Sequence, residues 1–498
     1  HPTDVFEDAD GSVLVINTGG WYKICCPTSQ FYRPEVLGGI YRVKKIGQHN
    51  VVDPRGNNIN WNSLSVKQLV ELLGDQRFAV HNRARQQIGE LGAASVSSCR
   101  QALQNISDAN HRLQIVWALC QNPATEARRA NHVALNDKDT TVIHAALHEI
   151  SLHQDKAAAP AIRDRFQSFD AYNQRIAAEC LGRIGAPQDV PLLLNTLTAD
   201  TDRALEHSLI YAAIEIGDTT PLNQLVKSTN VPTVRGALIA LDQSPGNNLP
   251  AEFALAALEA NDEALRETGW WLVANHPDWA AQLPDYFRQR IERLKPDTEQ
   301  RQQLLQRLSA YLNTPELLAM AGELLATGDT DSQTFVLEAI SNAKLDTVPE
   351  SIVAGVLRAL NSTDTDTLAL AVQAANSIRT DTPNEAVQSR LLTVYQHSAN
   401  TPEVRLAALS AMSPASRPLT EDTLNDIQQY AGANQPLQLQ SLTVDLLVTS
   451  PWPTAQWRQI PQVISALGSM HLRRVVIALA KTNEQQTALN TLNALATA

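Results

Sequence analysis

The sequence predicts an all-α solenoid, a stack of helical pairs, over residues 65–498, with a short β segment before it. A pattern of apolar, small and apolar residues at helical spacing recurs at intervals of about 30 residues. The chain has 498 residues, which is longer than one ordinary hydrophobic core supports. With 44% hydrophobic but 5% aromatic residues, the chain can form an aliphatic core but has few of the aromatic side chains typical of a large enzyme core. A repeat array accounts for all three observations.

Two short strands are expected near the N-terminus. A turn at Asp10-Gly11 leads into the branched run at residues 12–17, which suits a buried strand. Residues 37–43 alternate between apolar and polar types and indicate a second strand, while residues 18–34 form a loop rich in Gly, Pro and aromatic residues. Two or three strands cannot bury a face by themselves. This segment therefore needs packing neighbours.

The N-terminal residues resemble a known kind of propeller blade. Residues 7–15, 19–22 and 39–43 are similar to the closing blade of glucose/sorbosone-dehydrogenase-like β-propellers, which belong to the quinoprotein-type sugar dehydrogenases. Residues 53–56 and 72–80 are similar to the passage from propeller to HEAT-like repeats in planctomycete-type membrane-bound dehydrogenase-like proteins. In those proteins a c-type cytochrome domain follows the repeats.

The resemblance covers residues 4 to about 92 and implies three parts of the chain. Residues 1–46 would be the remnant of a closing β-propeller blade, residues 47–64 a linker, and residues 65–498 a HEAT-like, armadillo-like α-solenoid. The resemblance also implies an extracytoplasmic, periplasmic parent protein that uses a quinone cofactor and c-type haem. This chain lacks most of the propeller and has no C-x-x-C-H haem motif, so no cofactor is expected in it.

Each helical pair is expected to pack through one face of its inner helix. Val142, Ala146 and Ile150 follow an i, i+4, i+8 pattern, with a small residue where the next helix approaches. This pattern resembles the inner helix of HEAT-like pairs, and its period lengthens to about 35 residues in the C-terminal part. Gly185 marks a helix end. Residues 279–308 fit the pattern less well and are expected to form an irregular or longer pair.

Charge and hydropathy argue against two classes of partner. The net charge of −12 and the pI of about 5.5 disfavour a broad phosphate-binding surface, so nucleic acid is not an expected partner. No stretch approaches the roughly 20 apolar residues that cross a bilayer, so no membrane insertion by this segment is expected. The expected partner is a protein, or the missing propeller and cytochrome domains of the parent.

His144 and His148 stand at i, i+4 on one predicted helix and are the candidate metal ligands. His148-Glu149 followed by His153 is one residue too long for the zinc-protease motif, because a five-residue step turns the second His away from the first. The HEAT-like deoxyhypusine hydroxylases repeat His-Glu pairs to hold two irons, and a single such pair occurs here. Solvated or capping histidines are the favoured interpretation.

Cys25 and Cys26 are adjacent and are the candidates for a vicinal disulfide, a link that some quinoproteins place beside their cofactor. Pro27 would stiffen the turn after them. Adjacent cysteines require a distorted peptide, so two buried or free thiols are the alternative. An oxidising compartment would favour the disulfide, whose role would be structural first.

Trp270 and Trp271 are the candidate partner surface. Aromatic side chains contribute much of the binding energy in protein interfaces. Both residues lie in a helical apolar stripe, however, so packing in the core is the favoured interpretation and a partner site is the alternative.

Helical repeat arrays offer an extended binding wall rather than an enclosed polar pocket. We therefore expect a non-catalytic protein-interaction or spacer solenoid, a scaffold within an extracytoplasmic quinoprotein-dehydrogenase-like multidomain protein. No catalytic residue is expected in this chain, although the parent would be a sugar or alcohol dehydrogenase. The alternative is a metal- or cofactor-dependent oxidoreductase in its own right. Its centre would lie near His144 and His148, or at residues 21–34 in a site that another chain completes.

Overall fold

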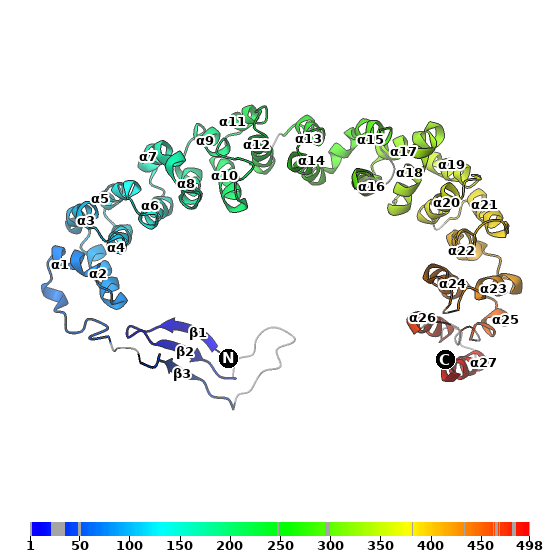
Figure 1. Ribbon diagram of the computed structural model, residues 1–498, viewed down its shortest axis with the longest axis horizontal. Helices are drawn as coiled ribbons and strands as arrows, with labels where there is room; N and C mark the ends of the chain where they lie inside the picture. Colours follow the sequence, from blue (N-terminus) through cyan, green and yellow to red (C-terminus); the bar gives the residue numbers. More distant parts are fainter. Residues whose placement is uncertain are drawn as a thin grey trace. The chain divides into compact units, whose positions relative to one another are not determined.

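The structure, a computed structural model, describes residues 2–20, 35–47, 51–246, 249–293, 299–380, 382–432, 434–461, 463, 467, 469–480 and 485–497. The chain divides into two compact units, His1–Leu272 and Val273–Ala498. Unit 1 contains a small sheet followed by helical pairs, and the described part of unit 2 consists of helical pairs (Figure 1). The predicted fold class, an all-α solenoid with a short N-terminal β segment, is confirmed.

The N-terminal segment is a three-stranded antiparallel sheet in the order β1-β2-β3. Its strands are β1 (Pro2–Glu7), β2 (Val13–Asn17) and β3 (Gly39–Val43). Both predicted strands are present, and β1 is a third strand that the sequence did not single out. The expected burial of β2 was wrong: the strand is exposed to half-exposed along its length, because its main contacts are with β1 and β3.

The helices of unit 1 form two rows (Figure 1). The inner row contains α2 (Phe78–Glu90), α4 (Ala109–Gln121), α6 (Thr140–His153), α8 (Ala171–Ile184), α10 (Arg203–Ile216) and α12 (Val231–Gln243). The outer row contains α1 (Val66–Leu72), α3 (Ala93–Asn105), α5 (Thr125–Asn131), α7 (Ala159–Arg165), α9 (Asp189–Leu194), α11 (Thr219–Leu225) and α13 (Ala251–Leu258). Short 3-10 helices lie at Trp61–Ser63, His132–Asn136, Lys156–Ala158 and Phe166–Ser168. The unit boundary falls within α14 (Glu263–Asn275).

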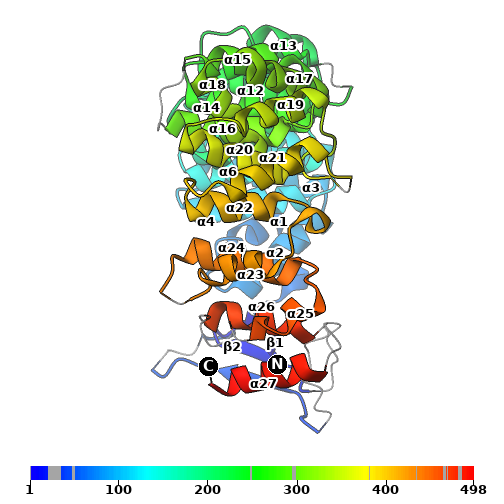
Figure 2. The same cartoon turned by 90° about the vertical axis from the view of Figure 1, so that its right-hand side faces the viewer.

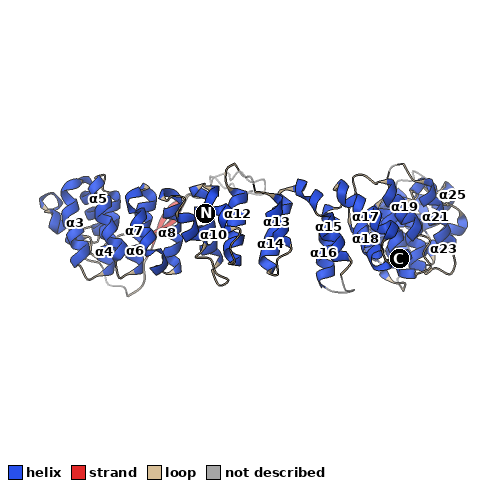
Figure 3. Cartoon of the chain, turned by 90° about the horizontal axis from the view of Figure 1, so that it is seen from above, coloured by secondary structure: helices blue, strands red, loops and turns tan. Residues whose placement is uncertain are grey.

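The predicted apolar stripe explains how the inner row stacks. Val142, Ala146 and Ile150 of α6 are each 0% exposed, and α4, α6, α8 and α10 contact one another in that order. Figure 3 shows these helices standing side by side. Asp139 caps α6 by accepting a hydrogen bond from the Thr141 backbone N–H at 2.9 Å. Gly185 is the C-cap of α8, as expected from the sequence.

The linker between the sheet and the helices is packed against the first helical pair. Trp61 is buried, and its Nε1–H donates to the Gly56 carbonyl at 2.8 Å. The guanidinium of Arg83 on α2 lies 4.5 Å from the centroid of the Trp61 ring. Arg77, which precedes α2, donates to the Asp53 carbonyl at 3.0 Å. These contacts fix residues 53–61 of the linker against the first helical pair.

Unit 2 repeats the same arrangement. One row contains α16 (Glu299–Tyr311), α18 (Thr330–Asn342), α20 (Thr365–Ser377), α22 (Pro402–Ala411), α24 (Leu437–Thr449) and α26 (Ser469–Leu479). The other contains α15 (Pro284–Ile291), α17 (Pro315–Thr327), α19 (Glu350–Ala359), α21 (Glu385–Gln396), α23 (Glu421–Gln428), α25 (Thr454–Trp457) and α27 (Gln485–Thr497). Figure 2 shows α20, α22, α24 and α26 as successive layers. Further 3-10 helices lie at Pro277–Gln282 and Pro414–Ser416, and the first overlaps the start of the stretch expected to be irregular.

Arg417, between α22 and α23, fastens the ends of two helices of unit 2. Its side chain is buried, and its Nε–H and Nη2–H donate to the carbonyls of Leu409 and Ser410 in the last turn of α22, at 3.1 and 2.9 Å. Its Nη1–H donates to Ser450 Oγ, just after α24, at 2.8 Å. Burial lowers the pKa of Arg417 to about 10, so the group remains charged at pH 7. The negative ends of the helix dipoles suit this cation.

Candidate interaction surface

The two candidate histidines project from α6 toward different helices. His144 stacks on Tyr172 of α8, with ring centroids 4.1 Å apart and an angle of 17° between the planes. His148 meets Trp117 of α4 edge-on, at 5.9 Å and 68°. Burial lowers the pKa of His144, so its ring is neutral at pH 7. The two rings link three neighbouring helices rather than converge on one ligand.

No metal centre is assembled in the part of the chain that the structure describes. Within those residues, no group of three or more His, Cys, Asp or Glu side chains is placed to hold a metal ion. Zinc and iron sites in proteins combine several His, Cys, Asp or Glu ligands around one ion. His144 and His148 therefore fit ring packing better than metal binding.

The rings belong to a wider set of side chains on the inner row, which we call the inner strip. It consists of Trp117 on α4, His144 and His148 on α6, Tyr172 and Arg175 on α8, and Arg203, His207 and Tyr211 on α10, all exposed or half-exposed. The His207 and Tyr211 rings are nearly parallel, with centroids 6.0 Å apart. Tyr172 and Tyr211 are each 51% exposed. The inner strip is a row of rings and guanidinium groups across four stacked helices.

Glu149, next to His148, is the most unusual ionisable group of unit 1. Its side chain is 0% exposed, and neither carboxylate oxygen has a hydrogen bond of good geometry. The closest cationic candidate is His153, whose Nε2 is 4.0 Å from Oε1 of Glu149, but this Nε2 also lies 2.9 Å from the Cys120 carbonyl. Burial raises the pKa of Glu149 to about 7, and the neighbouring Asn131 offsets part of that rise. This group is a candidate pH-sensitive position, not a nucleophile.

The cysteines provide no reactive site in the described residues. Cys25 and Cys26 lie outside those residues, so the vicinal disulfide stays a prediction. Cys99, Cys120 and Cys180 are free thiols. Burial raises the pKa of Cys99 to about 12 and that of Cys120 to about 11, so neither thiol is ionised at pH 7.

The two candidate tryptophans have different surroundings on α14. Trp270 is 6% exposed and packs in the core, whereas Trp271 is 40% exposed. Of this pair, Trp271 is the ring that a partner can reach. The sequence could not separate them, because adjacent residues on a helix differ by about 100° in direction and either could have faced inward.

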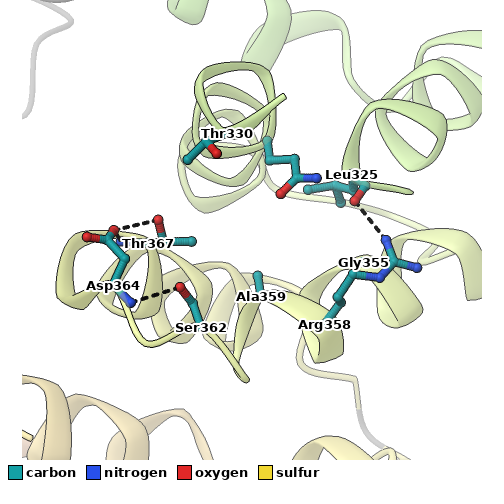
Figure 4. A pocket seen from close by; sticks show the side chains of 9 residues that line it. Leu325, Thr330, Gly355, Arg358, Ala359, Ser362, Asp364 and Thr367 are labelled. Atoms are coloured by element: carbon teal, nitrogen blue, oxygen red, sulfur yellow. Dashed lines mark hydrogen bonds between the residues drawn. The ribbon is translucent and has the colours of Figure 1, made fainter. Parts of the chain in front are cut away.

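A small polar hollow lies among α17, α18, α19 and α20 of unit 2 (Figure 4). Its volume is about 240 Å³. Arg358 donates to the Leu325 carbonyl at 2.9 Å, while Asp364 accepts from the backbone N–H and the hydroxyl of Thr367 at 2.8 and 2.7 Å. Arg358 thus binds a carbonyl in the last turn of α17, and Asp364 caps the start of α20. The lining residues include no nucleophile paired with a base.

No described helix is both long enough and apolar enough to cross a membrane. No protein-family model and no curated protein matches the sequence. The structure is similar to solved solenoids of nuclear transport factors. A crystal structure of Kap121p bound to RanGTP matches with 11% identity and a TM-score of 0.49, over 87% of this chain and 54% of that one.

Two further similar structures are a complex of Kap95p with RanGDP and importin beta crystallised from ammonium sulfate. The first has 10% identity and a TM-score of 0.40, over 87% of this chain and 67% of that chain. The second has 12% identity and a TM-score of 0.34, over 87% of this chain and 63% of that chain. The chain thus spans about half of the Kap121p chain that it matches. Identities this low and TM-scores below 0.5 carry no conclusion about function.

Proposed function

We infer that this chain is a non-catalytic protein-interaction and spacer solenoid of a larger extracytoplasmic, periplasmic protein, in which a quinoprotein-dehydrogenase-like propeller adjoins the sheet. The chain itself would hold no cofactor; the parent would use a quinone and c-type haem. Its partners would be protein surfaces, including the propeller and cytochrome domains. The observation that carries this proposal is the sheet, because both of its faces carry exposed apolar side chains.

One face of the sheet presents a row of apolar side chains from all three strands. Val5, Val15 and Tyr41 are paired across the strands and therefore point to the same side. Val43, two residues beyond Tyr41, joins them. Val5, Tyr41 and Val43 are 58%, 56% and 57% exposed.

The opposite face also carries apolar side chains, beside Asp4 and Arg42. Phe6 pairs with Leu14, and Ile16 pairs with Ile40, on positions that alternate with the first face. Phe6 is 45% and Ile40 is 71% exposed. A water-exposed antiparallel sheet normally keeps one polar face. A sheet with exposed apolar side chains on both faces fits between two other sheets, as a blade does in a β-propeller.

The sheet is also tied to the spacer that follows it. Asp8, after β1, forms an ion pair with Arg42 on β3 at 2.6 Å and a second one with Arg55 in the linker. The Arg42 hydrogen bond is the main reason that the pKa of Asp8 lies below its ordinary value. Arg55 lies next to Gly56, which accepts the hydrogen bond from Trp61. A protein bound to the sheet would thus be held at a defined place relative to the first helices.

The deciding experiment is intact mass with N-terminal sequencing of the protein from its native source, without added protease. A mass well above 54.5 kDa, with propeller sequence before His1, is the expected result. Cross-links from Lys44 or Lys45 into that propeller would locate the contact on the sheet. A mass of 54.5 kDa, without cross-links to any β-rich protein, would contradict the parent assignment.

A further inference from the structure

We propose that the inner strip binds an extended polypeptide segment that carries carboxylates together with proline or aromatic side chains. This inference rests on the proposed role as a protein-interaction solenoid and names the kind of partner. Four properties of the strip lead to it: where the exposed apolar side chains lie, how the rings are held, which charges lack partners, and how far apart the helices stand.

Exposed apolar side chains in the helical part of unit 1 are concentrated on the inner row. Over residues 65–272, the exposed large hydrophobic side chains are Leu91, Leu152, Tyr172, Tyr211 and Trp271. Leu91 directly follows α2, and the other four lie on α6, α8, α10 and α14. None lies on the described outer row. Tyr172 and Tyr211 belong to the inner strip, so the strip contains two of these five side chains.

The rings of the strip are fixed by contacts between neighbouring helices. Trp117 and His148 join α4 to α6, and His144 and Tyr172 join α6 to α8. Each stacked ring loses little conformational entropy on binding, because its rotamer is already restrained. Rigid aromatic platforms of this type favour proline rings and aromatic side chains in an extended chain. The rings of the strip are therefore preorganised for binding such a chain.

The charges of the strip select carboxylates. Arg175 and Arg203 are exposed and have no hydrogen-bonding or ion-pairing partner among the described residues. Glu179 is paired with Arg183 and Glu206 with Arg235. Asp170 and Asp202 accept backbone N–H bonds at the starts of α8 and α10, which leaves Glu215 as the unpaired carboxylate within these two helices. The strip thus has an excess of free guanidinium groups in a chain whose net charge is −12. Free guanidinium groups bind carboxylates in a bidentate manner.

The spacing of the helices sets the length of the segment. Packed helices stand about 8–10 Å apart, and an extended chain advances about 3.3 Å per residue. Three helix-to-helix steps from α4 to α10 therefore correspond to about nine residues, with one ring contact about every third residue. Single-stranded nucleic acid also combines charge with stacking, but it needs positive charge along the whole track. Two free guanidinium groups favour the peptide.

The test uses the full chain and fluorescein-labelled peptides of about twelve residues with the repeat Asp-Pro-Tyr, compared with Asn-Pro-Tyr and Lys-Pro-Tyr repeats. Fluorescence anisotropy at low ionic strength measures the affinity. We expect the Asp peptide to bind about tenfold or more tightly than the other two, and Arg175→Glu to weaken it about tenfold or more. Tyr172→Ala should weaken all peptides that bind.

The matched control is Arg129→Glu on the outer helix α5, an exposed arginine whose reversal should change the affinity by less than about twofold. Circular dichroism shows whether each variant keeps its helices. The proposal is overturned if the Asp peptide fails to bind, if Arg175→Glu and Arg129→Glu have equal effects, or if an oligothymidylate of similar length binds more tightly. Those outcomes leave the native mass, and with it the parent assignment, unaffected.

Discussion

Arg112 on α4 and Asp137, just before α6, form two parallel hydrogen bonds, from Nε to Oδ2 at 2.7 Å and from Nη2 to Oδ1 at 2.8 Å. Both side chains are almost fully buried, at 3% and 8% exposure. Nη1 of the same guanidinium donates to the Ser107 carbonyl at 2.7 Å. Arg112 thus connects the segment before α4 with the segment before α6. The packing of the two helices depends on the pairing of the Arg112 and Asp137 charges.

Replacing Arg112 with Met should destabilise unit 1 strongly. Burial alone would raise the pKa of Asp137, but Arg112 and the Asp139 backbone N–H together hold that pKa below its ordinary value. Without Arg112 the buried carboxylate has lost its counter-ion, and a loss of about 3–5 kcal/mol is expected. Urea unfolding followed by circular dichroism measures it. Arg175→Met, at an exposed position, serves as the control, and equal losses in the two variants would refute the expectation.

Glu149 should make unit 1 less stable as the pH rises through neutrality. A pKa of about 7 in the fold, against an ordinary value of 4.5, means that the fold favours the protonated acid. Its contribution is complete below about pH 4.5 and is lost as the pH passes through about 7. Glu149→Gln removes the charge, so it should raise the melting temperature at pH 8 and change it little at pH 5.

The size of the Glu149 effect follows from the shift. The rise of the pKa from 4.5 to about 7 corresponds to a loss of about 3 kcal/mol in the free energy of unfolding above pH 8. Asn131 and Arg128 oppose this rise in the pKa of Glu149, whereas Asp155 adds to it. Glu126→Gln, on the exposed surface of α5, is the matched control. A melting temperature of Glu149→Gln that follows the wild type at both pH values would show that the carboxyl is solvated.

The double variant His144→Ala, His148→Ala tests the oxidoreductase alternative. Because the two rings contact Tyr172 and Trp117 rather than each other, we expect the purified chain and the variant to contain equal, substoichiometric amounts of metal. Elemental mass spectrometry of both proteins checks this. One equivalent of metal in the wild type, lost in the variant, would favour a metal enzyme over a scaffold.

The isolated chain should self-associate through its sheet. Exposed apolar side chains on both faces, and edges at β1 and β3 that pair with no other described strand, promote association of sheets. Tyr41→Asp should reduce the concentration-dependent association seen by sedimentation velocity. Val52→Asp, at a linker residue that is 84% exposed, is the control. If both variants behave like the wild type, the sheet is not the adhesive surface.

Much of the fold could be predicted because it depends on local spacing. The i, i+4, i+8 stripe placed Val142, Ala146 and Ile150 in the core, and all three are buried. β1 was missed because its few residues show no pattern of their own; the strand is defined by pairing with β2. Local sequence carries no information on such a partner until the sheet is built.

The candidate surface was less predictable, because it depends on how helices are rotated against one another. His144 and His148 were found from their spacing, but their ring partners Tyr172 and Trp117 lie on neighbouring helices. Glu149 adjoins His148 in sequence, yet its complete burial depends on packing from α4 and α5. The signal that could have indicated it is its place directly before Ile150, on the side of the helix that carries the core stripe.

The ordered linker has a mechanical consequence. Asp8 pairs with Arg55, Gly56 accepts a hydrogen bond from Trp61, and Arg83 covers the Trp61 ring, so side-chain contacts among the described residues connect the sheet to α2. A twist or pull applied to the sheet would pass into the first helical pair instead of being absorbed by slack chain. In such a protein, a domain bound to the sheet would set the orientation of the helical repeats that follow.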